Sequence, residues 1–227
     1  MTQFNINQRF QFLTNLATMV ISKTTQSLIV VGEGGLGKTY AINSAISANG
    51  LDDSDYVFFK GYSTARGLYN ALYDNNGKII VFDDCDSILE DKVALNILKS
   101  ALDSYDKREI TWMAKMNKSD EYPSQFQFTG GIIFISNKSK DSIDGAILSR
   151  SLVVDLTMTF EEKVNRMEHI LPNILTDYDM DVKTDALNFL KGCGSDNINL
   201  RTLIMISKIR SQFPISWEDM ASYMIKN

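Results

Sequence analysis

A glycine-rich segment near the start of the chain has the residue types and spacing that bind a phosphate group. The eight residues Gly32 to Thr39 read GEGGLGKT and match the pattern G-x-x-x-x-G-K-[S/T] in full. Glycines let the backbone turn tightly, so that several N–H groups point at one anion. An apolar run precedes the segment and a helical pattern follows it, and a helix amino terminus favours negative charge. The segment therefore predicts a nucleotide-phosphate site.

Two side chains at the end of this segment carry the chemistry. Lys38 is expected to reach the β- and γ-phosphates of a bound triphosphate, and the Thr39 hydroxyl to ligate Mg²⁺. The other residues predicted to contact the nucleotide are Gly32, Glu33, Gly34, Gly35, Leu36, Gly37 and the adjoining Tyr40.

A second signal is an apolar run that ends in two acids, Ile79 to Phe82 followed by Asp83 and Asp84. In an open parallel sheet, carboxylates at the carboxyl end of a strand lie at the crevice where ligands bind. Asp83 is expected to hold the magnesium ion, directly or through water. Asp84 is expected to orient or deprotonate the attacking water. An apolar strand that ends in acids is common in proteins. Its position after the glycine-rich loop makes the pattern a specific indication of a nucleotide site.

The elements that position these residues alternate between strands and helices. Strands are predicted over residues 27–31, 56–59, 78–82, 132–135 and 152–156. Helices are predicted over residues 10–21, 40–48 and 64–73, and another follows the strand at 78–82 and runs to about residue 102. The alternation implies right-handed crossovers and a parallel sheet covered on both faces, which is an α/β fold with five strands. Residues 105–130 interrupt the pattern and predict an inserted hairpin or long loop.

After residue 156 the pattern is wholly helical. Thr159 and Glu162 have the spacing of a capping box that opens a helix. Later helices are expected over residues 184–191 and 200–211 and from about residue 215, with a break at residues 192–194. We therefore expect an α/β domain over residues 1–157, with its amino-terminal helix within residues 1–25, and a small helical lid over residues 158–227.

The chain resembles the AAA+ ATPases, with residues 32–39 as Walker A and residues 79–84 as Walker B. Three later segments are similar to motifs of that family: Ile132 to Asn137 to the sensor 1 strand, Asp144 to Arg150 to the arginine-finger segment, and Asn199 to Arg201 to sensor 2. The resemblance implies ATP and Mg²⁺ as cofactors.

The resemblance also implies roles for the residues in those segments. Asn137 would help to position the attacking water, and Arg150 would reach the ATP of a neighbouring subunit. Arg201 would touch the γ-phosphate within its own chain. A strand-ending asparagine and a solvated arginine are the ordinary alternatives for Asn137 and Arg150. The chain departs from the family at Asp84, where a glutamate is usual, and the shorter side chain suggests slow hydrolysis or a compensating shift of the loop; Asp86 is a weaker stand-in.

The segment Lys60, Gly61 and Tyr62 follows the second predicted strand, where AAA+ translocases carry a substrate-gripping pore loop. It is one candidate substrate contact, and the basic loop at residues 115–118 is another. The alternative for the first is an ordinary short loop, after a strand whose Phe58 and Phe59 complete the core. The alternative for the second is a solvated loop tip.

The leading interpretation is a motor or remodelling ATPase that acts as a homo-oligomer, as a hexameric ring when ATP is bound, on a protein or nucleic-acid substrate. The chain is also similar to small ATPases encoded by phages. One alternative is an ATP-controlled loader or switch that acts on DNA or a replication partner. Another is a monomeric small-molecule kinase, against which the helical lid and Asn137 argue.

The composition and net charge of the chain limit the functions and cellular locations that are expected. The net charge of −5 opposes a protein that coats nucleic acid mainly by electrostatics. The two cysteines, Cys85 and Cys193, lack metal-site spacing and are expected to be small buried thiols. The apolar runs are too short to cross a bilayer, and no signal peptide is evident, so a cytoplasmic protein without a membrane partner is expected. His169, the single histidine, has no partner ligands in the sequence around it.

Overall fold

The computed structural model of the chain describes residues 4–105, 107–113, 122–194 and 198–226. The chain forms two compact units. The sheet unit comprises Arg9–Glu33 and Lys38–Thr157. The helical unit comprises Met1–Gln8, Gly34–Gly37 and Met158–Asn227. The basic loop predicted at residues 115–118 lies outside the described residues.

The sheet unit is built on five parallel strands in the order β2-β3-β6-β1-β7. Their bounds are β1 Ser27–Val31, β2 Tyr56–Lys60, β3 Ile79–Asp83, β6 Gly131–Ile135 and β7 Leu152–Asp155. Every residue of β1, β3 and β6 is buried, which is why these strands are apolar along almost their whole length. The predicted α/β class and the five-stranded parallel sheet are confirmed.

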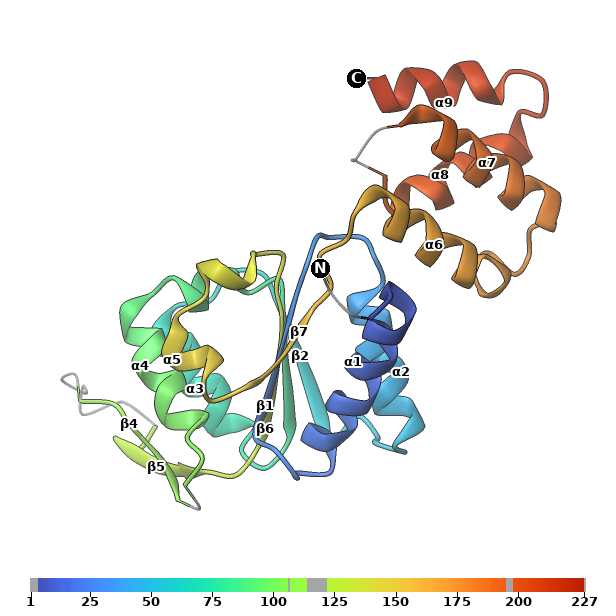
Figure 1. Cartoon of the computed structure of the whole chain (residues 1–227). Coiled ribbons are helices and arrows are strands. Elements are labelled where there is room, and N and C mark those ends of the chain that lie inside the picture. Colours follow the sequence, from blue (N-terminus) through green and yellow to red (C-terminus); the bar gives the residue numbers. More distant parts are fainter. Residues whose placement is uncertain (1–3, 106, 114–121, 195–197, 227) are drawn as a thin grey trace. The chain divides into compact units, whose positions relative to one another are not determined.

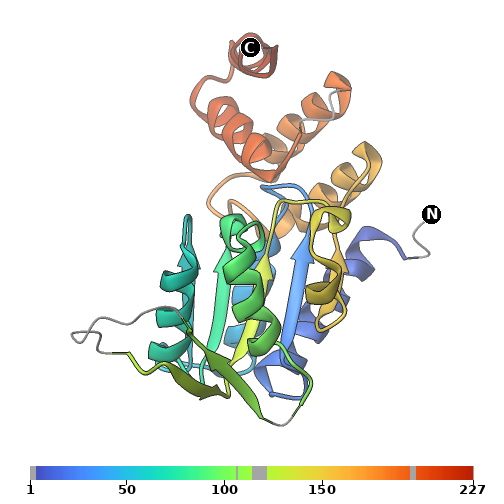
Figure 2. The same ribbon diagram turned by 90° about the vertical axis from the view of Figure 1, so that its left-hand side faces the viewer.

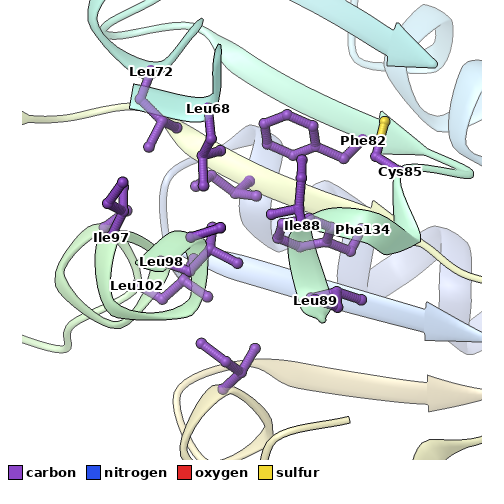
Figure 3. Close-up of a cluster of buried hydrophobic side chains, with 14 of the residues drawn as sticks. Leu68, Leu72, Phe82, Cys85, Ile88, Leu89, Ile97, Leu98, Leu102 and Phe134 are labelled. Carbon is purple, nitrogen blue, oxygen red and sulfur yellow. The ribbon is translucent and has the colours of Figure 1, made fainter. Parts of the chain in front are cut away.

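Helices cover both faces of this sheet (Figure 1). Helices α1 (Ile6–Ile21) and α2 (Lys38–Ala48) lie on one face, and α3 (Ala65–Asp74), α4 (Lys92–Ala101) and α5 (Gly145–Leu148) lie on the other. On the second face the Phe82 ring is stacked between two others, with centroids 5.6 Å from Phe59 and 5.0 Å from Phe134. Leucines of α3 and α4 pack around these rings (Figure 3). This core holds the carboxyl ends of β3 and β6 in fixed register.

Two short 3-10 helices, η1 (Asp86–Leu89) and η2 (Lys140–Ser142), precede α4 and α5, and a third, η3 (Leu171–Asn173), belongs to the helical unit. The single helix predicted after residue 82 is therefore two elements, η1 and α4. Asp91 separates them, because its carboxylate accepts hydrogen bonds from the amides of Val93 and Ala94 and caps the start of α4.

The predicted insertion contains an antiparallel strand pair, β4 (Arg108–Thr111) and β5 (Gln125–Phe128). Strand β4 ends at Thr111, immediately before Trp112. The buried Arg108 guanidinium ties the pair to the sheet unit by donating to the carbonyl oxygens of Ala101 and Gly130, at 3.0 and 2.8 Å. Gly130 immediately precedes β6, so the pair lies at the amino-terminal end of the strands, away from the arrowheads (Figure 2).

The helical unit contains α6 (Phe160–Ile170), α7 (Met180–Cys193), α8 (Leu200–Gln212) and α9 (Trp217–Lys226). The capping box predicted at Thr159 and Glu162 is present. Helix α7 is longer than predicted at both ends. It runs through Gly192 and stops at Gly194, whose left-handed backbone (φ 59°) is a common helix terminator.

The end of α7 also corrects the prediction for the cysteines. Cys193 is exposed on the last helical position, whereas Cys85 is buried as predicted. No helix in the described ranges combines the length and the apolar composition needed to cross a bilayer.

Candidate functional site

The glycine-rich loop between β1 and α2 has a backbone that only glycine tolerates at several positions. Gly32, Gly35 and Gly37 have φ values of 138°, 77° and 94°, a region that side chains rarely adopt. A Cβ atom on Gly32 would also lie 2.9 Å from the carbonyl carbon of Leu156, the residue after β7. The glycine spacing is therefore a requirement of this loop shape, in addition to any need to approach a ligand.

Lys38 is the first residue of α2 and its side chain folds back into the loop. Only 5% of the residue is exposed. Its ammonium donates to the carbonyl oxygens of Gly32 and Glu33, at 2.5 and 2.7 Å, and to Oδ1 of Asn137 at 2.9 Å. A buried ammonium requires such partners. The ammonium is thus held inside the loop by groups that an anion could replace.

Thr39 and Asp83 form the oxygen pair expected of a magnesium site. The Thr39 hydroxyl lies 3.2 Å from Oδ1 and 3.1 Å from Oδ2 of Asp83, and the Asp83 side chain is 7% exposed. Hard oxygen ligands of this kind suit Mg²⁺, which in phosphate sites uses one or two carboxylates, with phosphates and water completing the shell. Among the described residues, no three His, Cys, Asp or Glu side chains converge as a metal cluster. The residues fit Mg²⁺ held together with a nucleotide.

Asp84 has a left-handed backbone, with φ 57°. Its amide donates to the Ile135 carbonyl at 3.1 Å, which fixes the turn after β3. Aspartate and asparagine tolerate this conformation better than most residues do, whereas a longer acid gains nothing from it. The backbone conformation gives a physical reason for an aspartate at the position where the AAA+ pattern has glutamate.

Asn137 joins two of the predicted site residues. Its Nδ2 donates to Oδ1 of Asp84 at 2.7 Å, while its Oδ1 accepts from the Lys38 ammonium. The tip after β6 therefore connects the acid after β3 with the lysine of the glycine-rich loop. Three residues that are far apart in sequence form one hydrogen-bonded chain.

Sequence analysis did not identify the contact that fixes this tip. The hydroxyl of Ser136, 1% exposed, donates to Asp86 Oδ1 at 2.6 Å and accepts from the Lys138 amide at 3.0 Å. Asp86 is thereby engaged beside Asn137 and is not available as a replacement for Asp84. The only hint in the sequence is that both residues are polar and follow buried strands.

Lys60 forms a contact that differs from the predicted one. It was expected to contact substrate, yet its ammonium forms an ion pair with Asp83 Oδ2 at 3.1 Å. The next two residues extend away from the site. Gly61 has φ 90° with open space around it, and Tyr62 is 83% exposed.

Four other predicted site residues have different surroundings. Arg150 lies just after α5, and its Nη1 donates to the Ala146 carbonyl at 2.9 Å within the same segment. Its buried Nε has no hydrogen-bond partner among the described residues. Arg201 is exposed on α8 of the helical unit, and Tyr40 is 73% exposed on α2. Leu36 is buried, with 1% exposed.

Cys85 lies between Asp84 and Asp86 in the segment after β3, and its thiol is unreactive at neutral pH. Burial, and next the nearby carboxylate of Asp83, raise the pKa of its thiol to about 11. Its sulfur donates to the Phe59 carbonyl at 3.4 Å. The thiol therefore stays protonated at neutral pH and serves as packing between β2 and β3.

The chain has a relative among the proteins of a bacteriophage. An uncharacterised 36.7 kDa protein from the nrdC-mobD intergenic region of Enterobacteria phage T4 is 30% identical over an alignment of 241 residues. The alignment covers 96% of this chain and 73% of the phage protein. No family model matches the chain.

Solved structures identify the fold. The chain is similar to NtrX of Brucella abortus, solved in complex with ADP, with a TM-score of 0.58 and 14% identity over 88% of this chain and 47% of that one. It is also similar to a mutant of Thermotoga maritima RuvB, with a TM-score of 0.51 and 12% identity over 94% of this chain and 71% of that one. Both are AAA+ P-loop ATPases, so the chain has the AAA+ fold. It spans less than half the length of NtrX.

Proposed function

This chain belongs to the family of the uncharacterised 36.7 kDa phage T4 protein and has the AAA+ fold, and on that premise we propose that it binds and hydrolyses Mg-ATP. The sites are proposed to lie at the interfaces of a homo-oligomeric ring, hexameric when ATP is bound. Hydrolysis would remodel or translocate a protein or nucleic-acid substrate. The proposed parts are an α/β nucleotide-binding domain over residues 1–157 and a helical lid over residues 158–227.

The observation that carries the proposal is the chain of contacts at the carboxyl end of the sheet. Lys38 contacts Asn137, which contacts Asp84, and Thr39 contacts Asp83. Separate segments of the chain would thus supply a lysine for the phosphates, two ligands for magnesium and a carboxylate with its asparagine partner. ADP in the NtrX structure supports a nucleotide as the ligand of this fold.

Each residue has a definite part in the proposed reaction. Lys38 would exchange its carbonyl and Asn137 partners for oxygens of the β- and γ-phosphates, with the amides of residues 32–37 around them. Thr39 and Asp83 would hold Mg²⁺, which neutralises charge on the phosphates when it is bound. Asp84, kept in place by Asn137, would orient or deprotonate the attacking water. Arg150 of the adjacent subunit would stabilise the charge of the transition state.

Assembly gives a direct test of the ring. Gel filtration of the protein with Mg²⁺ and a non-hydrolysable ATP analogue is expected to show an oligomer that is absent without nucleotide. A protein that binds the analogue and stays monomeric would contradict the ring and favour a kinase. The Lys38→Ala variant is the control, because it should not respond to the analogue.

A second function is favoured by one observation, the aspartate at position 84. Its carboxylate is one methylene shorter than the usual glutamate, and misplacement of about 1 Å can slow a reaction about 100-fold. Slow turnover suits a loader or switch that assembles on DNA or a replication partner and resets by hydrolysis. Stimulation of ATP turnover by single-stranded DNA, with an affinity that falls as salt rises, would favour this function. The net charge of −5 weakly opposes it.

A further inference from the structure

The ion pair between Lys60 and Asp83 occupies the position expected for a metal ion. Oδ2 of Asp83 lies 3.1 Å from the Lys60 ammonium and 3.1 Å from the Thr39 hydroxyl. That oxygen belongs to the carboxylate proposed to ligate Mg²⁺. A lysine ammonium therefore supplies positive charge at this carboxylate.

Strand register puts Lys60 there. Lys60 and Asp83 are the last residues of the neighbouring parallel strands β2 and β3, and they are direct partners in the register. The lysine side chain is 64% exposed and the aspartate side chain 7% exposed. The ammonium thus approaches a nearly buried carboxylate from the solvent side, which leaves it free to move away.

We propose that Lys60 competes with Mg²⁺ for Asp83, so that metal loading releases Lys60 and repositions the exposed residues Gly61 and Tyr62. The inference rests on the proposed function, because it takes Asp83 as a metal ligand. An ammonium and a divalent cation repel each other when both lie against one carboxylate, so each weakens the binding of the other there. Binding of one therefore favours release of the other.

The loop after β2 is built so that such a release stays local. Ser63 is held on both sides by Ser87 of η1: its amide donates to the Ser87 hydroxyl, and its carbonyl accepts from it, each at 3.2 Å. Between Lys60 and this anchor lie only Gly61 and Tyr62. Gly61 has φ 90°, and apart from its chain neighbours no atom of the described residues lies within 4 Å of the place where a Cβ would stand, so no packed side chain opposes a change of backbone conformation there. A change at Lys60 is therefore transmitted to Tyr62, the exposed aromatic side chain of this loop.

This arrangement assigns Lys60 a regulatory part that differs from direct substrate contact. Without metal, the loop is tied to the nucleotide site through Asp83. With metal, the tie is broken and Tyr62 and Lys60 are free to take another position. Binding of the metal ion would thus change the position of exposed residues on the protein surface.

The test measures Mg²⁺ affinity and loop exchange in the full chain with ADP, so that no turnover is needed. In the Lys60→Met variant, the Mg²⁺ concentration that half-saturates Mg-dependent ADP binding is expected to fall by about five- to tenfold, since the competing charge is gone. Lys60→Arg, which keeps the charge, should stay near the wild-type value. Lys107→Met, at another exposed lysine, is the matched control.

Hydrogen exchange gives the second measurement. Adding Mg²⁺ and ADP to the wild-type protein should speed amide exchange at Gly61 and Tyr62, beyond the effect of ADP alone. In Lys60→Met these amides should exchange fast from the start and respond little to the metal. Lys60→Gln, which also removes the charge but keeps a polar side chain, should behave like Lys60→Met. Circular dichroism spectra of both variants should match that of the wild type, which excludes misfolding as the cause.

The outcomes separate this inference from the proposed function. If wild-type protein binds ADP in a Mg²⁺-dependent way and Lys60→Met shows unchanged half-saturation and unchanged exchange, the competition is wrong while the nucleotide site stands. If wild-type ADP binding has no dependence on Mg²⁺, Asp83 does not hold the metal, and the inference falls together with the proposed metal site.

Discussion

Replacing Arg150 with alanine is expected to lower ATP turnover by about 10³-fold or more while leaving ATP affinity nearly unchanged. A guanidinium supplied to the transferring phosphate stabilises charge that develops only in the transition state, so its loss acts on turnover and not on binding. The measurements are steady-state hydrolysis and nucleotide binding on the same preparation.

The geometry of Arg150 is compatible with this role. Its Nη1 is held by the carbonyl of Ala146, while its buried Nε has no partner among the described residues. An unpaired buried donor costs free energy, so a movement of the guanidinium that exposes this donor to a ligand of another subunit would be favoured. Arg201 in the helical unit provides a comparison, because it is expected to act within its own chain. Arg201→Ala should lower turnover, and the Arg150 of a neighbouring subunit should not restore it.

Mixing subunits shows whether Arg150 acts between chains. Arg150→Ala and Asp84→Asn are each expected to be nearly inactive, because each removes one half of a shared site. A mixture should recover part of the activity, since some interfaces then combine an intact Asp84 with an intact Arg150. If the activity of the mixture only equals the sum of the activities of the two separate variants, Arg150 does not act on a neighbouring subunit. That result would favour a monomeric enzyme.

The second large effect is expected at Asp84. Asp84→Asn should lower turnover by about 10²- to 10⁴-fold, the range that a general base contributes, with ATP affinity retained. Asparagine also tolerates the left-handed backbone at this position (φ 57°) and can still accept the Asn137 hydrogen bond through its Oδ1. The substitution therefore removes the charge of the carboxylate with little change of shape.

Two controls support the interpretation of this variant. Asp141→Asn changes an exposed acid in η2 and should leave turnover unchanged. Denaturant unfolding of Asp84→Asn should give a stability close to that of the wild type. Turnover within about threefold of wild type in Asp84→Asn would show that another group activates the water, and Asp84 would lose its assignment.

Much of the fold could be predicted because it depends on local patterns. Buried parallel strands are apolar along their length, and the alternation with helices specifies right-handed crossovers. The capping box at Thr159 likewise depends on residues that are close in sequence. The limits of α7 were less accurate: it begins after Asp179, a residue type that favours helix starts but makes no capping hydrogen bond here, and Gly192 is tolerated inside the helix.

The contacts between segments could not be predicted, because they depend on register and backbone conformation. The pairing of Lys60 with Asp83 follows from the alignment of β2 with β3, which the sequence does not specify. The bond between Ser136 and Asp86 joins two loops that are brought together only by the sheet. The left-handed backbone of Asp84 depends on its bond to Ile135 in the next strand. The exposure of Cys193 reflects its place at the end of α7.

The most direct test of the account is the affinity of the purified protein for ATP and GTP with Mg²⁺, measured by calorimetry for wild type and Lys38→Ala. We expect measurable binding of at least one nucleotide by the wild type, weakened by about 100-fold in the variant, because a charge-assisted bond to phosphate is worth up to about 3 kcal/mol. Lys107→Ala should bind as wild type does. No measurable affinity in the wild-type protein, or equal affinity in a folded Lys38→Ala, would contradict the nucleotide site from which every other assignment follows.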